Sequence, residues 1–409
     1  MNVPTPTKPT PARPGPEHQR IRVLARTFAS RLDRLKREFV GRGGTIDLIG
    51  LALLCREHVL LVGPPGTAKT ALLGRFGELL DSPPFTYLLS RFTEPAELFG
   101  PLDVRRFQQE GEYRVNTAGM LPRAHLAFLD EVFQGSSAIL NTLLTLINDR
   151  RFHNGSAVEP CNLVTLLGAS NEVPDDPVLA AFGDRFLLRC RLDYVPDDEL
   201  EDLLDTGWAA ERELIARPGP AAGEVARTRT VFRLSDLALL HEALADVDLG
   251  PVRNTYARIV RDLREEGVVF SDRRAVKAQK VIAAAALLAG RAKAEAADLA
   301  VLVHVWADVR DEPAFHRIVA GHGIAVAQPG HRVRDVAEIR IDLRELQAHR
   351  DVLAAREEYH ELMRRLRRLA DEVRNSHPAE GALLAEIQQE IRLVITGFRE
   401  KYREDLDDV

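Results

Sequence analysis

The chain has 409 residues, 45% of them hydrophobic and 28% charged, which is typical of a soluble globular protein with two or three domains. Its net charge of −6 argues against a general nucleic-acid-binding protein, although it allows a local basic surface. The three cysteines lie far apart and match no metal or disulfide spacing, which indicates a reducing, cytoplasmic environment.

Residues 1–16 are rich in Pro and Thr and have no apolar centre, so we expect a disordered tail rather than a signal peptide. No apolar run elsewhere is long enough to span a bilayer, and we therefore expect no membrane insertion.

Strand and helix patterns alternate from residue 17 to about 195. The expected strands are 58–63, 85–90, 124–130, 163–169 and 187–193. The clearest helix is 136–150, where Ser136 is a candidate N-cap and apolar residues recur three and four positions apart. This alternation predicts an α/β fold with a doubly wound parallel sheet, in which ligands bind at the C-terminal ends of the strands.

Two turn signals interrupt the alternation. Asn154-Gly155 predicts a two-residue turn between 151–153 and 156–158. Glu110-Gly111 predicts the turn of a second hairpin over about 104–117.

From about residue 196 the strand patterns end, and we expect a helical domain over 196–310 with helices at 236–247, 251–266 and 272–288. In 311–409, apolar stripes at 359–373 and 384–398 predict an antiparallel helical hairpin. A long isolated coiled coil is not expected, because Arg350 falls where its seam needs an apolar residue.

The most informative segment is Gly-Pro-Pro-Gly-Thr-Ala-Lys-Thr at 63–70, which follows an apolar strand and precedes a helix. This is the context of a phosphate-binding loop, in which Lys69 reaches the β- and γ-phosphates and the Thr70 hydroxyl coordinates Mg²⁺. Ala68 stands where the general pattern has Gly, and we expect it at the helix start with a negative φ that tolerates its methyl group. The residues predicted to bind ATP in this segment are Gly63, Pro64, Pro65, Gly66, Thr67, Ala68, Lys69, Thr70 and Ala71.

A second apolar strand ends in Asp130-Glu131. Asp130 is expected to contact the nucleotide and, with Thr70, to hold Mg²⁺, while Glu131 polarises the water that attacks the γ-phosphate. The alternative is an ordinary Gly-Pro turn and two solvated acids. Because both segments occur in order and each follows a strand, the sequence predicts a nucleoside triphosphatase.

Asn171 ends a further strand, and two interpretations are open. Its neutral amide could contact the γ-phosphate or the attacking water. It could instead only cap the turn before Pro174.

Two arginine positions also have two interpretations each. Arg185 could stabilise transition-state charge at a neighbouring subunit's nucleotide, or it could form a surface salt bridge with Asp184 or Asp193. Arg273 or Arg274, at a helix start, could fold over the γ-phosphate, or both could be solvated.

These segments together resemble the MoxR group of AAA+ ATPases, and most closely its RavA (regulatory ATPase variant A) branch. The resemblance is dense from about 40 to 195, looser to 310 and faint beyond. The matching stretches are GPPGTAKT at 63–70, SRFTEPAELFGPL at 90–102, FLDEVFQGSSAILNTLLTLINDRRFHNG at 128–155, LLGASNEVP at 166–174, FGDRF at 182–186 and FSDRR at 270–274.

The resemblance implies a hexameric ring with nucleotide sites between subunits, a helical lid after the α/β core, and chaperone-like remodelling with a partner that carries a von Willebrand factor A domain. The segments near 104–117 and 151–158 would be an insert before the third strand and a hairpin before sensor 1. The implied roles are Walker A for Lys69 and Thr70, Walker B for Asp130 and Glu131, sensor 1 for Asn171, arginine finger for Arg185 and sensor 2 for Arg273.

Three alternatives concern the partners and the activity of the chain. RavA proteins bind a lysine decarboxylase through a strand-rich module, and 311–409 shows no such module, so that partner is not expected. A DNA motor would show basic hairpins, but Glu110 and Glu112 accompany the arginines of 104–117, which with the net charge favours protein partners. The third possibility is a nucleotide-gated scaffold that hydrolyses ATP too slowly to do work.

Overall fold

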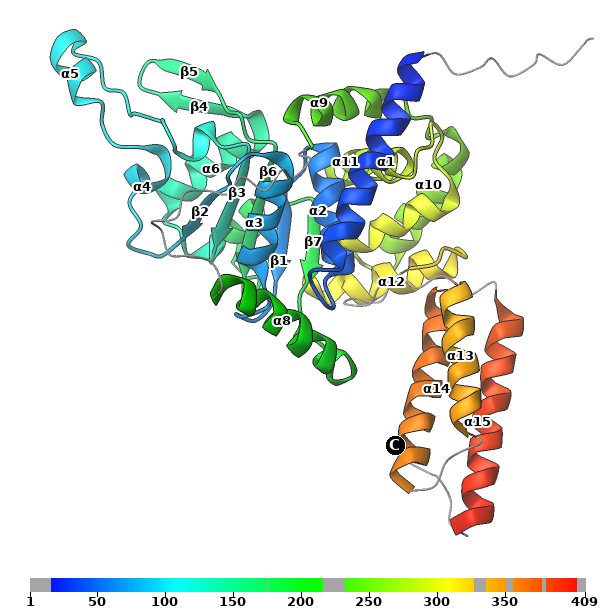
Figure 1. Cartoon of the computed structure of the whole chain (residues 1–409). Helices are drawn as coiled ribbons and strands as arrows, with labels where there is room; N and C mark the ends of the chain where they lie inside the picture. The colour runs from blue at the N-terminus through cyan, green and yellow to red at the C-terminus, as the bar shows by residue number, and fades with distance from the viewer. Residues whose placement is uncertain are drawn as a thin grey trace, which may run out of the picture.

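The computed structural model describes residues 16–174, 176–215, 232–326, 336–350, 356–376 and 380–402. The tail expected at 1–16 lies outside the described residues except for its last position. Figure 1 shows an α/β core, a group of helices beside it, and a separate unit of three C-terminal helices.

Five parallel strands form the central sheet in the order β2-β3-β6-β1-β7. All five expected strands are confirmed, and the three central strands are buried along nearly their whole length, as parallel strands between helical layers are. Their bounds are β1 Val59–Val62, β2 Phe85–Leu88, β3 Leu126–Asp130, β6 Thr165–Ser170 and β7 Leu188–Arg191.

The helix expected at 136–150 is present as α6, and most of its apolar residues are buried as its periodicity predicted. Ser136 caps α6 as predicted, because its Oγ accepts a hydrogen bond from the N–H of Ile139 at 3.4 Å. The helices up to the last strand and just beyond it are α1 Pro16–Lys36, α2 Gly43–Cys55, α3 Lys69–Leu80, α4 Pro95–Phe99, α5 Val104–Glu110, α6 Ser137–Asp149, α7 Pro177–Gly183 and α8 Leu200–Ile215.

The first predicted hairpin is present as β4 (Arg151–Asn154) and β5 (Ala157–Pro160), but its turn is Gly155-Ser156, one residue later than expected. Gly155 has φ 62°, and a Cβ there would lie 2.2 Å from the carbonyl oxygen of Tyr113. The position therefore requires glycine.

The hairpin expected at 104–117 is wrong, because its first half is helix α5. The Asp103 side chain caps this helix by accepting the N–H of Arg106, and Gly111 closes it in the left-handed region with φ 63°. Glu110-Gly111 thus ends a helix, and a single bridge between Leu102 and Val115 closes the loop.

A second group of helices packs on the core through α1, which contacts α2, α9 and α11. The ring of Phe28 in α1 lies 5.0 Å from that of Phe232, just before α9. Their buried side chains belong to the same hydrophobic cluster as those of the sheet. The α-helices of this group are α9 Leu234–Ala243, α10 Arg253–Glu265, α11 Asp272–Leu288 and α12 Glu312–Gly321.

The C-terminal helices form a hydrophobic cluster of their own. The expected two-helix hairpin is present as the last two helices, and a third helix that was not expected packs on both of them. Arg350, which falls where a coiled-coil seam would need an apolar residue, pairs with the buried carboxylate of Glu390. The bounds are α13 Val336–Arg350, α14 Arg356–Ser376 and α15 Gly381–Tyr402.

Within the described ranges, no helix combines the length and the apolar character needed to cross a membrane. The three cysteines are free thiols in buried positions.

Candidate functional site

The loop at 63–70 joins β1 to α3 in the middle of the sheet. The N–H of Gly63 donates to the carbonyl of Ser170 at 3.0 Å, and that of Leu192 donates to Val62 at 2.7 Å, so the ends of β6 and β7 flank the loop. A Cβ on Gly63 would lie 1.9 Å from the Leu192 carbonyl oxygen, which explains the glycine. Gly66, with φ 80°, is exposed with open space around it.

Ala68 differs from the expectation. It lies in the left-handed region, with φ 63° and ψ 19°, not at a negative φ. A Cβ in this region costs roughly 1–2 kcal/mol relative to the right-handed region, and glycine would avoid that cost. The loop therefore keeps a strained turn at the position where the general pattern has Gly.

The Lys69 ammonium folds back over the loop. Its Nζ donates to the carbonyls of Gly63 at 2.6 Å and Pro64 at 3.2 Å, and the residue is 7% exposed. Burial lowers the pKa of Lys69 below its ordinary value, while the charges of Asp130 and Glu131 oppose that shift. A buried cation held only by carbonyl groups suits an anionic ligand.

The two predicted acids and Asn171 meet at the ends of adjacent strands. Asp130 ends β3, and its Oδ1 accepts the N–H of Glu131 at 3.0 Å. Asn171, just after β6, donates its Nδ2 hydrogen to Glu131 Oε1 at 2.8 Å. The turn before Pro174 is held instead by Ser170, whose hydroxyl donates to the Glu172 carbonyl at 2.7 Å, so capping this turn does not occupy the Asn171 side chain.

This end of the sheet, which we call the carboxyl edge, fits a triphosphate with a divalent cation. The N-terminus of α3 and the Lys69 ammonium supply hydrogen-bond donors for phosphate oxygens. The exposed Thr70 hydroxyl and the half-buried Asp130 carboxylate supply the oxygen ligands that Mg²⁺ prefers. Ala71 lies exposed in the first turn of α3, and Pro65 at the tip of the loop.

Arg185 lies at the opposite end, the amino edge of the sheet. It lies three residues before Leu188, the first residue of β7, whose N–H donates to the carbonyl of His58, the residue just before β1. A four-residue strand separates the two edges by about 13 Å. The Arg185 Nε is buried without a hydrogen-bond partner, and within the described ranges the side chain forms no ion pair.

The surface salt bridges considered for Arg185 are made by other arginines. Asp193 lies 3.3 Å from Arg191. Asp184 accepts a hydrogen bond from Arg274 at 3.1 Å.

Arg273 and Arg274 also lie at the amino edge, although they are neighbours with different surroundings. Arg274 is 2% exposed and donates to the carbonyls of Leu187 at 2.8 Å and Val305 at 3.0 Å. Arg273 has a 38% exposed side chain, which donates to Asn148 Oδ1 at 2.8 Å. The structure thus places Arg273 with Arg185, away from the phosphate-binding loop of its own chain.

Sequence reasoning missed Asp184 as the carboxylate that joins the two groups of helices. Its oxygens lie 3.1 Å from Arg274 and 3.9 Å from Arg273, both at the start of α11. The only sequence signal was an acid directly before Arg185. Nothing in the sequence pattern showed that its partners would come from about ninety residues downstream.

Two protein families match the chain. Residues 26–226 match the MoxR domain of MoxR-vWA-beta-propeller ternary systems, and residues 249–319 match an AAA lid domain.

Curated relatives include two uncharacterized proteins of Methanocaldococcus jannaschii. One is 34% identical over 70% of this chain and 72% of its own length, and the other is 35% identical over 69% and 71%. Chaperone MoxR1 of Mycobacterium tuberculosis is 26% identical over 54% of this chain and 57% of its own.

Among solved structures, that of a proposed ATPase from Cytophaga hutchinsonii aligns with a TM-score of 0.56 at 16% identity. The alignment covers 76% of this chain and 97% of that one, and it shows the fold alone.

Proposed function

Because the chain belongs to the MoxR family of AAA+ ATPases, we propose that it hydrolyses ATP with Mg²⁺ at sites shared between neighbouring copies in a ring, six in number by resemblance. The hydrolysis drives remodelling or maturation of a protein partner that carries a von Willebrand factor A domain.

The contact between Asn171 and Glu131 carries the hydrolysis proposal. A carboxylate that accepts a hydrogen bond from a neutral amide keeps its position without losing its charge, because the amide brings no proton to give away. Glu131 can then accept a proton from water beside the γ-phosphate. Lys69 binds phosphate oxygens, and Thr70 and Asp130 would hold Mg²⁺, which supplies charge neutralisation.

The separation of the two edges supports the ring. A nucleotide held by Lys69 at the carboxyl edge cannot also be reached by Arg185 or Arg273 at the amino edge of the same chain. A neighbouring copy that packs its amino edge against this carboxyl edge would supply both arginines. The Arg185 side chain makes no hydrogen bond or ion pair with any described residue, which fits a side chain that completes its contacts in such an interface.

The experiment that tests hydrolysis compares Glu131→Gln with Lys69→Ala. Glu131→Gln should bind ATP as tightly as wild type and lose phosphate release at least about a hundredfold, because it loses the general base and keeps the phosphate donors. Lys69→Ala should lose ATP binding itself. Fluorescent-nucleotide titration and steady-state phosphate release measure the two effects, and undiminished turnover by Glu131→Gln would reject the assignment.

The partner proposal is supported by the matched family, which is described from systems that combine MoxR with von Willebrand factor A and β-propeller proteins. Pull-down from native cells with Glu131→Gln and ATP should enrich a protein with a von Willebrand factor A domain, and Lys69→Ala is the matched control. Enrichment that is equal with both variants, or strong ATPase stimulation by DNA at moderate salt, would contradict this partner class.

A further inference from the structure

Arg189 is a buried arginine at the boundary between the α/β core and the region 249–319, which we call the lid. It is the second residue of β7 and is 2% exposed. Its guanidinium group donates to the carbonyl of Gly183 at 2.8 Å and to that of Ala307, and it lies 5.6 Å from the centre of the Trp306 ring. Gly183 ends α7 of the core, whereas Trp306 and Ala307 belong to the lid. Arg189 therefore ties one turn of the core to the lid.

The turn that Arg189 contacts is the one that carries Arg185. The carbonyl of Gly183 also accepts the N–H of Phe186 at 3.1 Å, and the N–H of Arg185 donates to the carbonyl of Phe182 at 3.0 Å. The buried rings of Phe182 and Phe186 pack edge to face, with 5.6 Å between their centres. Because the turn is closed in this way, the backbone of Arg185 follows any shift of the Gly183 carbonyl.

Arg274 joins the same two segments from within the lid. It belongs to α11, and its guanidinium group donates to the Asp184 carboxylate at 3.1 Å. It also donates to the carbonyls of Val305 at 3.0 Å and Trp306 at 3.2 Å. One buried arginine of the core and one of the lid thus connect the turn that carries Arg185 with a single segment of the lid.

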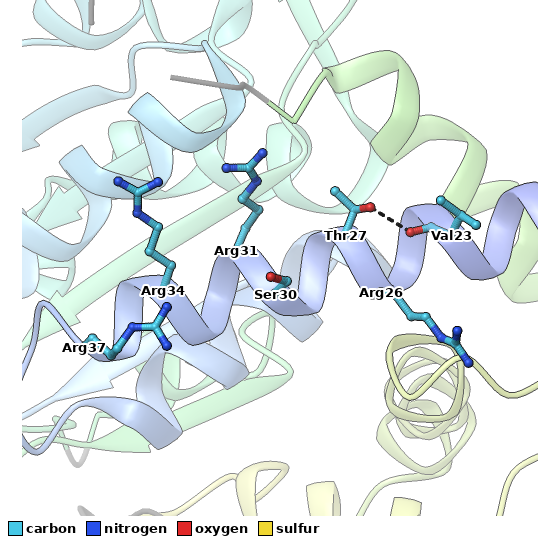
Figure 2. Close-up of a pocket in the computed structure, with 7 residues that line it drawn as sticks. All are labelled: Val23, Arg26, Thr27, Ser30, Arg31, Arg34 and Arg37. Atoms are coloured by element: carbon cyan, nitrogen blue, oxygen red, sulfur yellow. Dashed lines mark hydrogen bonds between the residues drawn. The ribbon is translucent and has the colours of Figure 1, made fainter. Parts of the chain in front are cut away.

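These two buried arginines differ from those of α1. Four arginines line a hollow along α1 and extend away from the helix on different sides (Figure 2). An arginine at the surface keeps its hydration, whereas burial of a guanidinium group costs several kcal/mol unless hydrogen bonds replace the lost water. If the carbonyl of Gly183 or Ala307 moved away, the buried charge of Arg189 would lose a partner, so the turn and the lid segment move together.

We propose that Arg189 is a positioning residue for Arg185, because it fixes the turn that carries Arg185 to the lid of the same chain. The inference rests on the proposed function, in which Arg185 acts on the nucleotide of a neighbouring copy. The Arg185 side chain makes no hydrogen bond or ion pair with any described residue, so its position depends on the turn. The lid of one copy then sets the position of the arginine that this copy presents to the next.

Arg189→Met removes the charge and both hydrogen bonds and keeps an unbranched side chain. Turnover by the full-length protein should fall about tenfold to a hundredfold, because a small displacement of a catalytic group has effects of this size. The KM for ATP should change little, since the loop around Lys69 is intact. Steady-state phosphate release over a range of ATP concentrations measures both constants. Unchanged turnover, or a change confined to KM, would contradict the proposal.

Mixtures of variants show whose nucleotide site is affected. Mixing Arg189→Met with Glu131→Gln should raise activity above the average of the two, because the Glu131→Gln copies present a well-placed Arg185. Mixing Arg189→Met with Arg185→Ala should give no recovery, since neither kind of copy presents such an arginine. A defect in the nucleotide site of its own chain would give the reverse pattern. Recovery with Arg185→Ala, or no recovery with Glu131→Gln, therefore overturns the proposal.

Two further variants separate positioning from stability. Asp298→Asn is the matched control, because it removes a buried charge that pairs with Arg291 at 2.6 Å within the lid. It should lower the urea midpoint of unfolding and leave turnover unchanged, and an equal loss of turnover would mean that any weakened lid has this effect. Arg189→Lys keeps a buried charge, but a single ammonium group does not reproduce the planar fork that donates to two carbonyls.

Arg189→Lys should therefore regain stability while its turnover stays closer to that of Arg189→Met than to that of wild type. If turnover returns together with stability, the role of Arg189 is structural and the proposal is wrong. Should Arg189→Met fail to fold, Arg189→Lys takes its place in both mixtures, with the same expected pattern.

The mixture of Arg185→Ala with Glu131→Gln is the reference for these experiments. If the reference shows no recovery, Arg185 does not act on a neighbour, and the shared sites and the role of Arg189 are both rejected. If the reference recovers and the Arg189→Met mixtures give the reverse pattern, only the role of Arg189 is rejected. Phosphate release by wild type and by Glu131→Gln alone tests the ATPase independently of both.

Discussion

The two edges of the central sheet hold their charged side chains in different ways. At the carboxyl edge the polar groups satisfy one another: Lys69 donates to loop carbonyls, and Asn171 donates to Glu131. At the amino edge the terminal nitrogens of Arg274 donate to carbonyls and to Asp184, whereas the Arg185 side chain makes no hydrogen bond or ion pair with any described residue. One edge is a preassembled site, and the other offers a side chain whose contacts are incomplete.

This difference shows which residues need a second copy of the chain to reach a nucleotide. A preassembled site can bind its ligand within one chain, because the donors and carboxylates already lie in place. An arginine at the far end of a four-residue strand cannot contribute to that site by any side-chain rotation. Mutations at the carboxyl edge should therefore act within their own chain, and mutation of Arg185 should act on the neighbour.

The largest effect is expected for Arg185→Ala, with a loss of turnover of about a thousandfold and little change in ATP binding, because an arginine finger acts on transition-state charge. Mixing it with Glu131→Gln should restore part of the activity, at interfaces that combine an intact Glu131 with an intact Arg185. Phosphate release across mixing ratios measures the effect. A verified mixture as inactive as either variant would show that Arg185 does not act on a neighbour.

A smaller effect, on stability, separates the adjacent arginines of α11. Arg274→Met should lower the free energy of unfolding by about 3 kcal/mol, because it leaves buried carbonyls and the Asp184 carboxylate without their donor. Arg273→Ala is the matched control, since its side chain is 38% exposed, and it should change turnover but not stability. Urea unfolding compares them, and equal losses would contradict the different roles.

Acid should weaken the amino edge through His58. The buried ring accepts the Leu166 N–H on Nδ1, and so its Nε2–H donates to the Ile147 carbonyl at 3.2 Å. Burial, and to a smaller extent the charge of Arg150, lower the pKa of His58 to about 3. With the folded pKa below the unfolded value, stability is full above about pH 6.5 and falls as the pH decreases toward 3.

Protonation of His58 in the unfolded chain should make the free energy of unfolding about 2 kcal/mol lower at pH 5 than at pH 7. His58→Gln, whose side chain keeps a donor and an acceptor but does not titrate, should remove that part of the pH dependence. Unfolding midpoints of both proteins from pH 7 to 5 measure the difference. Parallel curves would contradict the assignment to His58.

Several of these features were predictable from the sequence, because each depends on residues that lie close together in the chain. The five strands, the capped helix α6 and the loop at 63–70 each depend on residues close together in the chain. The hairpin expected at 104–117 failed because the cap by Asp103 lies outside the turn that suggested it. Asp184, tied to an arginine about ninety residues away, depends on tertiary packing that periodicity does not encode.

The smallest effect concerns the backbone of the carboxyl edge. Ala68 has φ 63° and ψ 19°, where glycine carries no Cβ penalty. Ala68→Gly should raise the free energy of unfolding by up to about 1 kcal/mol, since relief of the strain exceeds the added flexibility of the unfolded chain. Gly74→Ala is the matched exchange at a helical position with open space around it, where alanine should stabilise. A loss of stability in Ala68→Gly would mean that the left-handed turn is not strained, and the preassembled loop would then not depend on strain at this position.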